Sequence, residues 1–216
     1  MRFDDVLVRL ATLPGEPPEG PAALMPVLVD GDQARLRIRP EAATRARPAA
    51  VLVLLYPDAV GEAYVLLTER VDRGGHHSGE VSFPGGRAEA EDVDLVATAL
   101  RESAEEVGLD PDAAGLRVLG SWPPLWIPVS DYAVTPIMAV AERLPPLAAQ
   151  PTEVARILAA PVGLFLPDAE LLHVERDVRG WRLRYAAFPV DGLAVWGMTA
   201  RVLGSLGAVL AREPLP

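Results

Sequence analysis

The residues best suited to chemistry are three glutamates that follow a Gly-Gly pair. Glu102, Glu105 and Glu106 are spaced i, i+3 and i+4, which places them on one side of an α-helix, where they converge. Carboxylates held together repel one another unless a cation lies between them. Because Mg²⁺ and Mn²⁺ prefer hard oxygen ligands, the pattern predicts a divalent-metal site.

The composition excludes several kinds of catalysis. The chain has 216 residues, of which 50% are hydrophobic, enough for one well-filled domain. It contains no Cys and no Lys, so all 20 basic residues are Arg. A P-loop lysine, a Schiff base, a thiolate nucleophile and a disulfide are therefore all excluded.

The charge and hydropathy patterns narrow the class of partner. A net charge of −10 and a pI near 4.8 argue against nucleic acid, whose binding proteins usually carry a basic face. The N-terminus does not resemble a signal peptide, and no apolar run has the length of a membrane span. We therefore expect a cytoplasmic protein that binds no membrane; a small anionic substrate is compatible with the charge where Arg and metal ions reverse the local field. The Lys-free usage, rich in Ala, Pro, Leu and Arg, indicates a GC-rich bacterial source. A homodimer is left open.

The first half of the chain predicts a helix and a hairpin. Apolar residues at helical spacing predict a short helix over 3–13. Two aliphatic runs, 51–56 and 63–68, flank a turn and predict a hairpin of buried strands. A Gly-rich loop over 73–79 and a short strand over 81–83 follow, and Pro84-Gly85-Gly86 should break that strand.

The second half predicts the helix that carries the glutamates. From about Asp94 to Gly108 the helical period places Val96, Leu100, Ser103 and Val107 on a buried stripe, with the glutamates on the other side. Further strands are expected over 116–122, 134–141, 171–178 and 181–188, and helices over 151–158 and 196–210. This succession predicts an α/β class, with a mixed β-sheet between helices in an α/β/α sandwich.

The glutamates belong to a longer pattern that resembles a known family. Gly86 and the run Arg101, Glu102, Glu105, Glu106, Gly108, Leu109 resemble the Nudix box of hydrolases that act on linked nucleoside diphosphates. The upstream residues resemble the signature of the coenzyme A pyrophosphatase branch, through Leu66–Arg70, His77, Gly79 and Phe83–Gly86.

Two departures from these patterns affect the site. The box is one residue longer than the general form, and Asp92 fills the position of its first glutamate. Gly75 stands where the branch has an arginine, with Arg73 two positions earlier.

The resemblance implies a Nudix fold over 46–212, with residues 1–45 as an arm packed on it. It implies Mg²⁺ or Mn²⁺ bound by Glu102, Glu105, Glu106 and the Gly86 carbonyl. Arg101 and Asp92 would form an orienting ion pair, and the general base would be Glu153 from a later loop or Glu105 from the helix. Contacts to substrate would come from Arg70, Arg73, His77 and Gly85.

The implied reaction is hydrolysis of the diphosphate bond of coenzyme A or its derivatives, giving 3′,5′-ADP and 4′-phosphopantetheine. One alternative keeps the chemistry and changes the substrate to ADP-ribose, NADH or another nucleoside diphosphate derivative. Another is a Nudix module that binds a nucleotide without cleaving it. Trp122 and Trp126 are open to two readings, as a stacking surface for adenine or as core packing.

Overall fold

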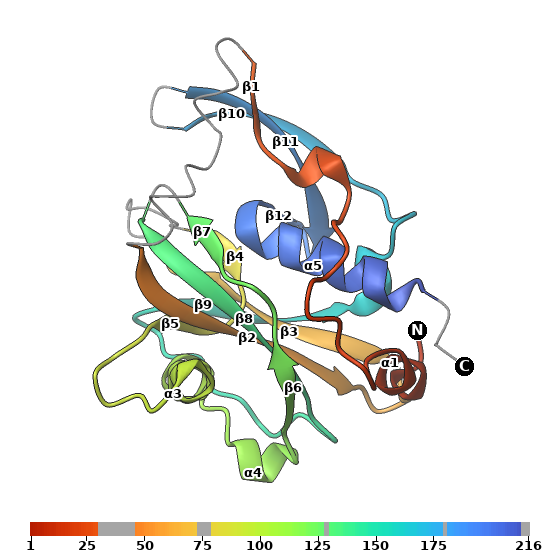
Figure 1. Cartoon of the computed structure of the whole chain (residues 1–216), viewed down its shortest axis with the longest axis vertical. Helices are drawn as coiled ribbons and strands as arrows, with labels where there is room; N and C mark the ends of the chain where they lie inside the picture. The colour runs from red at the N-terminus through yellow and green to blue at the C-terminus, as the bar shows by residue number, and fades with distance from the viewer. Residues whose placement is uncertain (30–45, 73–78, 128–129, 179–180, 213–216) are drawn as a thin grey trace.

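A mixed sheet of eight strands forms the centre of the protein (Figure 1). The computed structural model describes residues 1–29, 46–72, 79–127, 130–178 and 181–212. The path of hydrogen-bonded strands runs β4-β3-β2-β8-β6, with β5 beside β2, β7 beside β8 and β9 beside β3. The strands are β2 (Arg47–Pro57), β3 (Ala63–Arg70), β4 (Val81–Ser82), β5 (Gly85–Arg87), β6 (Arg117–Ser121), β7 (Leu125–Ile127), β8 (Tyr132–Val140) and β9 (Val154–Pro161).

The central strand β2 is buried on both faces, which explains its unbroken aliphatic sequence. Leu52 and Leu54 point into one hydrophobic cluster, while Val51, Val53 and Leu55 point into another. β2 runs parallel to β8 and antiparallel to β3. The predicted hairpin of buried strands is therefore confirmed, and the sheet is mixed as expected.

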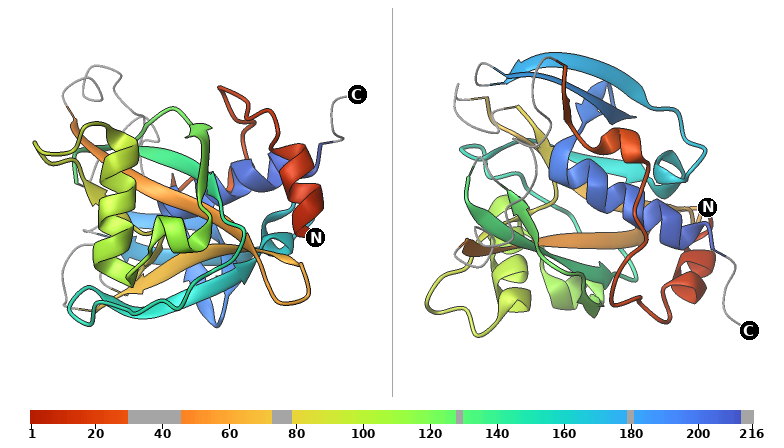
Figure 2. Two further views of the ribbon diagram at one scale, coloured as in Figure 1. Left: turned by 90° about the horizontal axis from the view of Figure 1, so that it is seen from below. Right: turned by 45° about the horizontal axis from the view of Figure 1, so that its top comes forward.

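Helices cover both faces of this sheet (Figure 2). α3 (Leu95–Val107) packs on one face, close to α4 (Pro111–Ala114). α5 (Gly197–Leu210) and α1 (Phe3–Arg9) pack on the other face. The α/β/α arrangement predicted from the sequence is confirmed.

A second sheet of four strands lies on the far side of α5 from the large sheet (Figure 1). The late hairpin predicted from the sequence supplies β10 and β11 of this sheet, but its separation into a sheet of its own was not predicted. Two 3₁₀ turns, η1 (Ala22–Leu24) and η3 (Val162–Phe165), pack near α5. The strands are β1 (Val27–Leu28), β10 (Leu172–Val178), β11 (Trp181–Val190) and β12 (Leu193–Val195).

One prediction of local structure was wrong, and one strand was missed. The segment expected as a helix over 151–158 forms a turn followed by β9, which pairs antiparallel with β3 through Leu67 and Leu158. Hydrogen bonding to the edge of β3 that faces away from β2 outweighs the weak helical propensity of residues 151–158. The strand before Pro84-Gly85-Gly86 ends as predicted, but the Gly-Gly pair also begins β5 and pairs with Ala50 and Val51, which was not predicted.

The N-terminal helix is shorter than the predicted 3–13, because it ends at Arg9. Its apolar face, formed by Phe3, Val6 and Leu10, is buried in the larger core cluster. The Met1 ammonium group lies 2.7 Å from the Glu62 carboxylate. Within the described ranges, no helix is long and apolar enough to cross a membrane.

Candidate active site

Helix α3 presents Glu102 and Glu106 toward the Gly-Gly strand. The Asp94 side chain caps its first turn by accepting a hydrogen bond from the Ala97 amide, and Gly108, with φ of 67°, ends it. Ser103 and Val107 are fully buried against the sheet. Glu106 lies next to Ser103, about 60° away around the helix axis, and is only 2% exposed. The prediction that all the glutamates lie opposite the buried stripe was therefore wrong for Glu106.

The Glu106 carboxylate is held by two donors from the sheet. The Gly85 amide donates to one oxygen at 3.0 Å, and the Arg70 guanidinium lies 3.4 Å from the other. Burial raises the pKa of Glu106 to about 7, and the charges of Glu102 and Glu153 add to the rise, against the lowering effect of the two donors. The protein thus buries a carboxylate without full compensation of its charge.

Glu102 lies one turn earlier, against Gly86. A Cβ atom at position 86 would lie 2.5 Å from the Glu102 carboxyl carbon, so only glycine leaves space for this carboxylate. Burial raises the pKa of Glu102, and the charges of Glu105 and Glu153 act in the same direction, while Arg101 opposes them.

Glu153 is brought to this helix by a loop that binds the end of α3. The Ala148 amide donates to the Val107 carbonyl at 3.0 Å, and the Gln150 amide donates to the Glu106 carbonyl at 2.8 Å. The Glu153 carbonyl in turn accepts from the Val71 amide at 2.9 Å, just after β3. Glu153 is exposed, yet its charge acts on both Glu102 and Glu106.

Arg101 links α3 to the segment that precedes it. Its guanidinium donates two hydrogen bonds of 3.0 Å to the Asp92 carboxylate and a third of 3.0 Å to the Arg87 carbonyl. These bonds hold the pKa of Asp92 well below its usual range. A further nitrogen contacts Glu102 at 3.1 Å and Glu105 at 3.2 Å. Arg101 and Asp92 therefore form the ion pair that the resemblance implied.

Glu105 faces a different direction from Glu106. Its side chain is 59% exposed and turns toward Arg101, because consecutive helical residues are about 100° apart around the axis. Across the described residues, no three His, Asp or Glu side chains are placed to hold one cation. The three helix glutamates thus do not converge on a single point, as the spacing had suggested.

The chemistry of the donor set nonetheless fits a divalent cation. Glu102 and Glu106 are acidic groups whose pKa values are raised, and both lie beside the Gly85-Gly86 strand. A cation would stabilise the ionised forms of both carboxylates. Because Gly86 has no Cβ, the Glu102 carboxylate can lie directly against the backbone there.

The structure brings together most of the residues predicted for the site. Arg73 and His77 lie outside the described residues. Two groups that sequence reasoning missed support the site: the Arg87 carbonyl, which accepts from Arg101, and the Gln150 amide, which donates to the Glu106 carbonyl. Both act through the backbone, so no side-chain pattern signals them. The residues that meet around the Gly-Gly strand are Arg70, Gly85, Gly86, Arg101, Glu102, Glu106 and Glu153.

The sequence of this chain matches one protein family. The model of the NUDIX domain matches residues 46–161, which include the large sheet, α3 and the Glu153 loop. The chain belongs to the Nudix hydrolase family. The match ends at the last residue of β9, so η3, the strands β10 to β12 and α5 lie beyond it.

Relatives of this Nudix protein occur in plants and bacteria. Nudix hydrolase 22, chloroplastic, of Arabidopsis thaliana is 36% identical over 178 residues, which are 79% of this chain and 57% of the relative. Nudix hydrolase 15, mitochondrial, of the same plant is 33% identical over 79% of this chain and 61% of the relative. Uncharacterized Nudix hydrolase NudL of Cronobacter sakazakii is 33% identical over 78% of this chain and 85% of the relative. The chain spans less than two thirds of either plant relative.

Proposed function

We propose that this Nudix protein is a divalent-metal-dependent pyrophosphohydrolase that cleaves the diphosphate bond of a nucleoside diphosphate derivative, with coenzyme A as the first candidate substrate. The observation that carries the proposal is the pair of carboxylates, Glu102 and Glu106, set against the Gly85-Gly86 strand with raised pKa values. Such a pair is costly to bury unless it serves to bind a cation.

Mg²⁺ or Mn²⁺ would be held by Glu102, Glu106 and the Gly86 carbonyl, with Glu105 at the periphery. When bound, such an ion neutralises the charge of a diphosphate and lowers the pKa of an attacking water molecule. Nudix hydrolases generally need a divalent ion of this kind.

The side chains around the metal ligands have separate tasks. Arg101 orients Glu102 through its bonds to Asp92 and to the Arg87 carbonyl. Arg70 lies beside Glu106 with 37% of its side chain exposed, so its guanidinium is free on one side to contact a substrate phosphate. Arg73, His77 and the Gly85 backbone stay predicted substrate contacts.

Glu153 is the better supported of the two candidate general bases. It is exposed and comes from a loop, and its charge acts on Glu102 and Glu106 together. The Glu105 carboxylate is engaged by the Arg101 guanidinium at 3.2 Å and is turned toward it. A base must reach the attacking water near the metal, and the position of Glu153 supports that role.

Coenzyme A is preferred on the sequence signature upstream of the box. Two parts of that signature contribute to the site: Arg70 contacts Glu106, and the Gly85 amide donates to the same carboxylate. Gly75, where the branch has an arginine, is the position that favours the alternatives, ADP-ribose and NADH.

The test is product analysis of the purified full chain with coenzyme A, ADP-ribose and NADH, each with Mg²⁺ and with Mn²⁺. We expect 3′,5′-ADP and 4′-phosphopantetheine from coenzyme A. Turnover of ADP-ribose alone would contradict the coenzyme A assignment and retain the chemistry. No turnover of any substrate with either metal, from protein shown to be folded, would contradict the enzymatic proposal and favour a nucleotide-binding module.

A further inference from the structure

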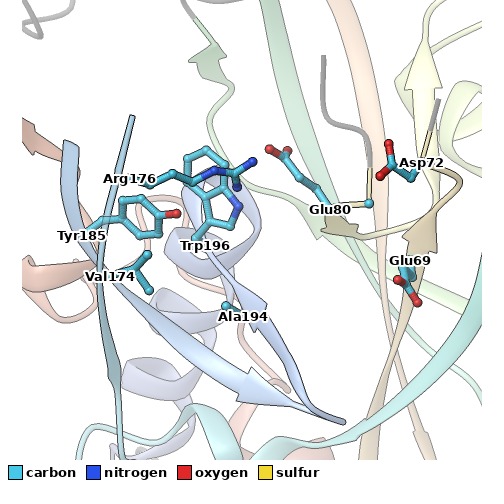
Figure 3. Close-up of a pocket in the computed structure, with 9 residues that line it drawn as sticks. Glu69, Asp72, Glu80, Val174, Arg176, Tyr185, Ala194 and Trp196 are labelled. Carbon is cyan, nitrogen blue, oxygen red and sulfur yellow. The ribbon is translucent and has the colours of Figure 1, made fainter. Parts of the chain in front are cut away.

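A pocket of about 470 Å³ lies where the second sheet meets the end of β3 and β4 (Figure 3). This volume is within the range of small-molecule sites. It lies on the opposite side of β3 from the metal-binding carboxylates, because Glu69 lines it while the next residue, Arg70, reaches Glu106. None of the residues proposed above for catalysis lines it.

One wall of the pocket is flat, aromatic and cationic. The rings of Tyr185 and Trp196 stack with centroids 4.7 Å apart and planes 21° apart. The Arg176 guanidinium lies over the Trp196 ring, 5.8 Å from its centroid. Tyr185 is buried, whereas Trp196 is half-buried and faces the pocket. Flat aromatic and guanidinium surfaces of this kind bind flat heteroaromatic rings.

The facing wall carries three carboxylates, from Glu69, Asp72 and Glu80 (Figure 3). Burial raises the pKa of Tyr185 and the Glu80 charge adds to the rise, which places Glu80 near the aromatic wall. Ionised carboxylates only accept hydrogen bonds, so this wall favours N–H donors over phosphate. The exocyclic amine of a purine is such a donor.

The pocket is also joined to the catalytic side through shared backbone. The Arg70 amide donates to the Glu80 carbonyl at 3.0 Å, so the strand end that directs Arg70 to Glu106 also carries Glu80 into the pocket. A substrate whose diphosphate lies near Glu106 would need to extend past this strand end to place its base there.

We propose that the pocket binds the amino-bearing purine ring of the substrate, with the ring stacked against Trp196 and its exocyclic amine donating to Glu80. This assignment rests on the proposed function, because it names the part of a nucleoside diphosphate derivative that lies away from the scissile bond. The aromatic wall of this site lies C-terminal to the residues that the family model matches, whereas Glu80 lies within them.

The test measures binding of adenosine, inosine and ribose to the metal-free full chain by isothermal titration calorimetry. These neutral probes carry no phosphate, so they do not depend on the catalytic carboxylates. Inosine replaces the exocyclic amine with a carbonyl, and ribose lacks the base. We expect adenosine to bind most tightly and ribose most weakly. Absence of adenosine binding by the wild-type chain would overturn the proposal.

Two variants test the two walls. Trp196→Leu keeps an apolar side chain but removes the flat surface, and we expect it to weaken adenosine binding about tenfold. Glu80→Gln should weaken adenosine binding and strengthen inosine binding, because the glutamine amide can donate to the inosine carbonyl. If Trp196→Leu does not fold, as judged by circular dichroism, Glu80→Gln decides, because this isosteric change is at a half-exposed residue.

Matched controls come from elsewhere in the fold. Trp126→Leu removes a half-buried tryptophan on β7, and Glu142→Gln removes an exposed carboxylate next to Gly115, after α4. Both should bind adenosine as the wild type does. Loss of adenosine binding in Trp126→Leu but not in Trp196→Leu would move the base site to β7 and overturn the proposal.

The outcome also separates this proposal from the proposed function. If wild-type protein binds adenosine through Trp196 but hydrolyses no diphosphate substrate, the pocket stands and the enzymatic proposal fails. If Trp196→Leu and Glu80→Gln hydrolyse an adenine-bearing diphosphate with wild-type KM, the enzymatic proposal stands and the pocket assignment fails.

Discussion

The two faces of the eight-stranded sheet carry two sites that are built in different ways. The face covered by α3 draws its main groups from one short stretch, with Gly85, Gly86, Glu102 and Glu106 within a strand and the next helix. The pocket on the other side of β3 draws on the ends of β3 and β4 and on β10, β11 and the start of α5. We therefore propose that the locally encoded site carries the chemistry, whereas the pocket assembled from distant strands selects the substrate.

The largest effect should come from Glu106, the buried member of the α3-face site. Glu106→Gln removes the charge that would hold a metal but keeps the shape of the side chain, so we expect it to remove essentially all turnover with the fold intact. Steady-state hydrolysis and circular dichroism measure both properties. Wild-type turnover in this variant would contradict the metal site.

The same substitution should alter stability with a defined dependence on pH. The folded-state pKa of Glu106, about 7, lies above its unfolded value, so the folded protein binds more protons between about pH 4.5 and 7 and loses stability as pH rises through that window. We expect Glu106→Gln to gain stability relative to wild type on going from about pH 5 to about pH 8 in metal-free buffer, by on the order of 3 kcal/mol at most.

Denaturant unfolding at the two pH values measures this difference, and Glu105→Gln is the matched control because Glu105 is exposed. Addition of Mg²⁺ should stabilise wild type more than Glu106→Gln. An equal difference in stability at both pH values would show that Glu106 is not the group held in its protonated form by burial.

The second effect concerns the general base, where the loop and the helix offer different candidates. Glu153→Gln should lower the rate constant by about 100-fold or more, the usual contribution of a general base, with little loss of metal affinity. Single-turnover hydrolysis, together with Mn²⁺ titration, separates the two effects. A wild-type rate would move the role to Glu105.

The third effect should come from substitution of the two glycines of β5, which lie against α3. A Cβ at position 86 meets the end of the flexible Glu102 side chain, so Gly86→Ala should move that carboxylate and lower activity about 10- to 100-fold, with little change in melting temperature. At Gly85, φ is 150° and a Cβ would lie 2.3 Å from the Ala50 carbonyl oxygen. Gly85→Ala should therefore lower the melting temperature, and an equal loss of stability in both variants would contradict this distinction.

The site on the α3 face was more predictable from the sequence than the pocket on the other face. The hairpin β2–β3, the α3 helix with its Asp94 and Gly108 ends, and the Arg101–Asp92 pair were all predictable, because each depends on local periodicity or on a short motif. The burial of Glu106 was not, since the helical period alone does not say how far the sheet covers the helix. Strand β9 was mistaken for a helix because its partner, β3, is distant in sequence.

The residues of the pocket could not be predicted from the sequence. Tyr185 and Trp196 read as ordinary strand and helix-start residues, and neither lies near a motif that marks a ligand site. Their stacking depends on β11 and β12 forming a hairpin that brings the start of α5 beside Tyr185. Only the three-dimensional pairing places Glu80, more than a hundred residues earlier in the chain, on the facing wall.

The smallest effect should come from the ion pairs that join the pocket walls. Arg156 on β9 contacts Glu69 on β3 at 2.5 Å and Asp191, in the turn before β12, at 2.9 Å. Because all three groups are partly or largely exposed, Arg156→Gln should lower the melting temperature by no more than a few degrees, and less at high salt. Arg182→Gln, which loses a contact only within the β10–β11 hairpin, is the matched control. If Arg156 only links these strands, the effect on kinetics should be limited to substrate binding. KM for an adenine-bearing substrate should then rise in Arg156→Gln and stay unchanged in Arg182→Gln, and kcat should stay unchanged in both variants. A fall in kcat as large as that of Gly86→Ala would instead show that the two faces of the sheet act as one site.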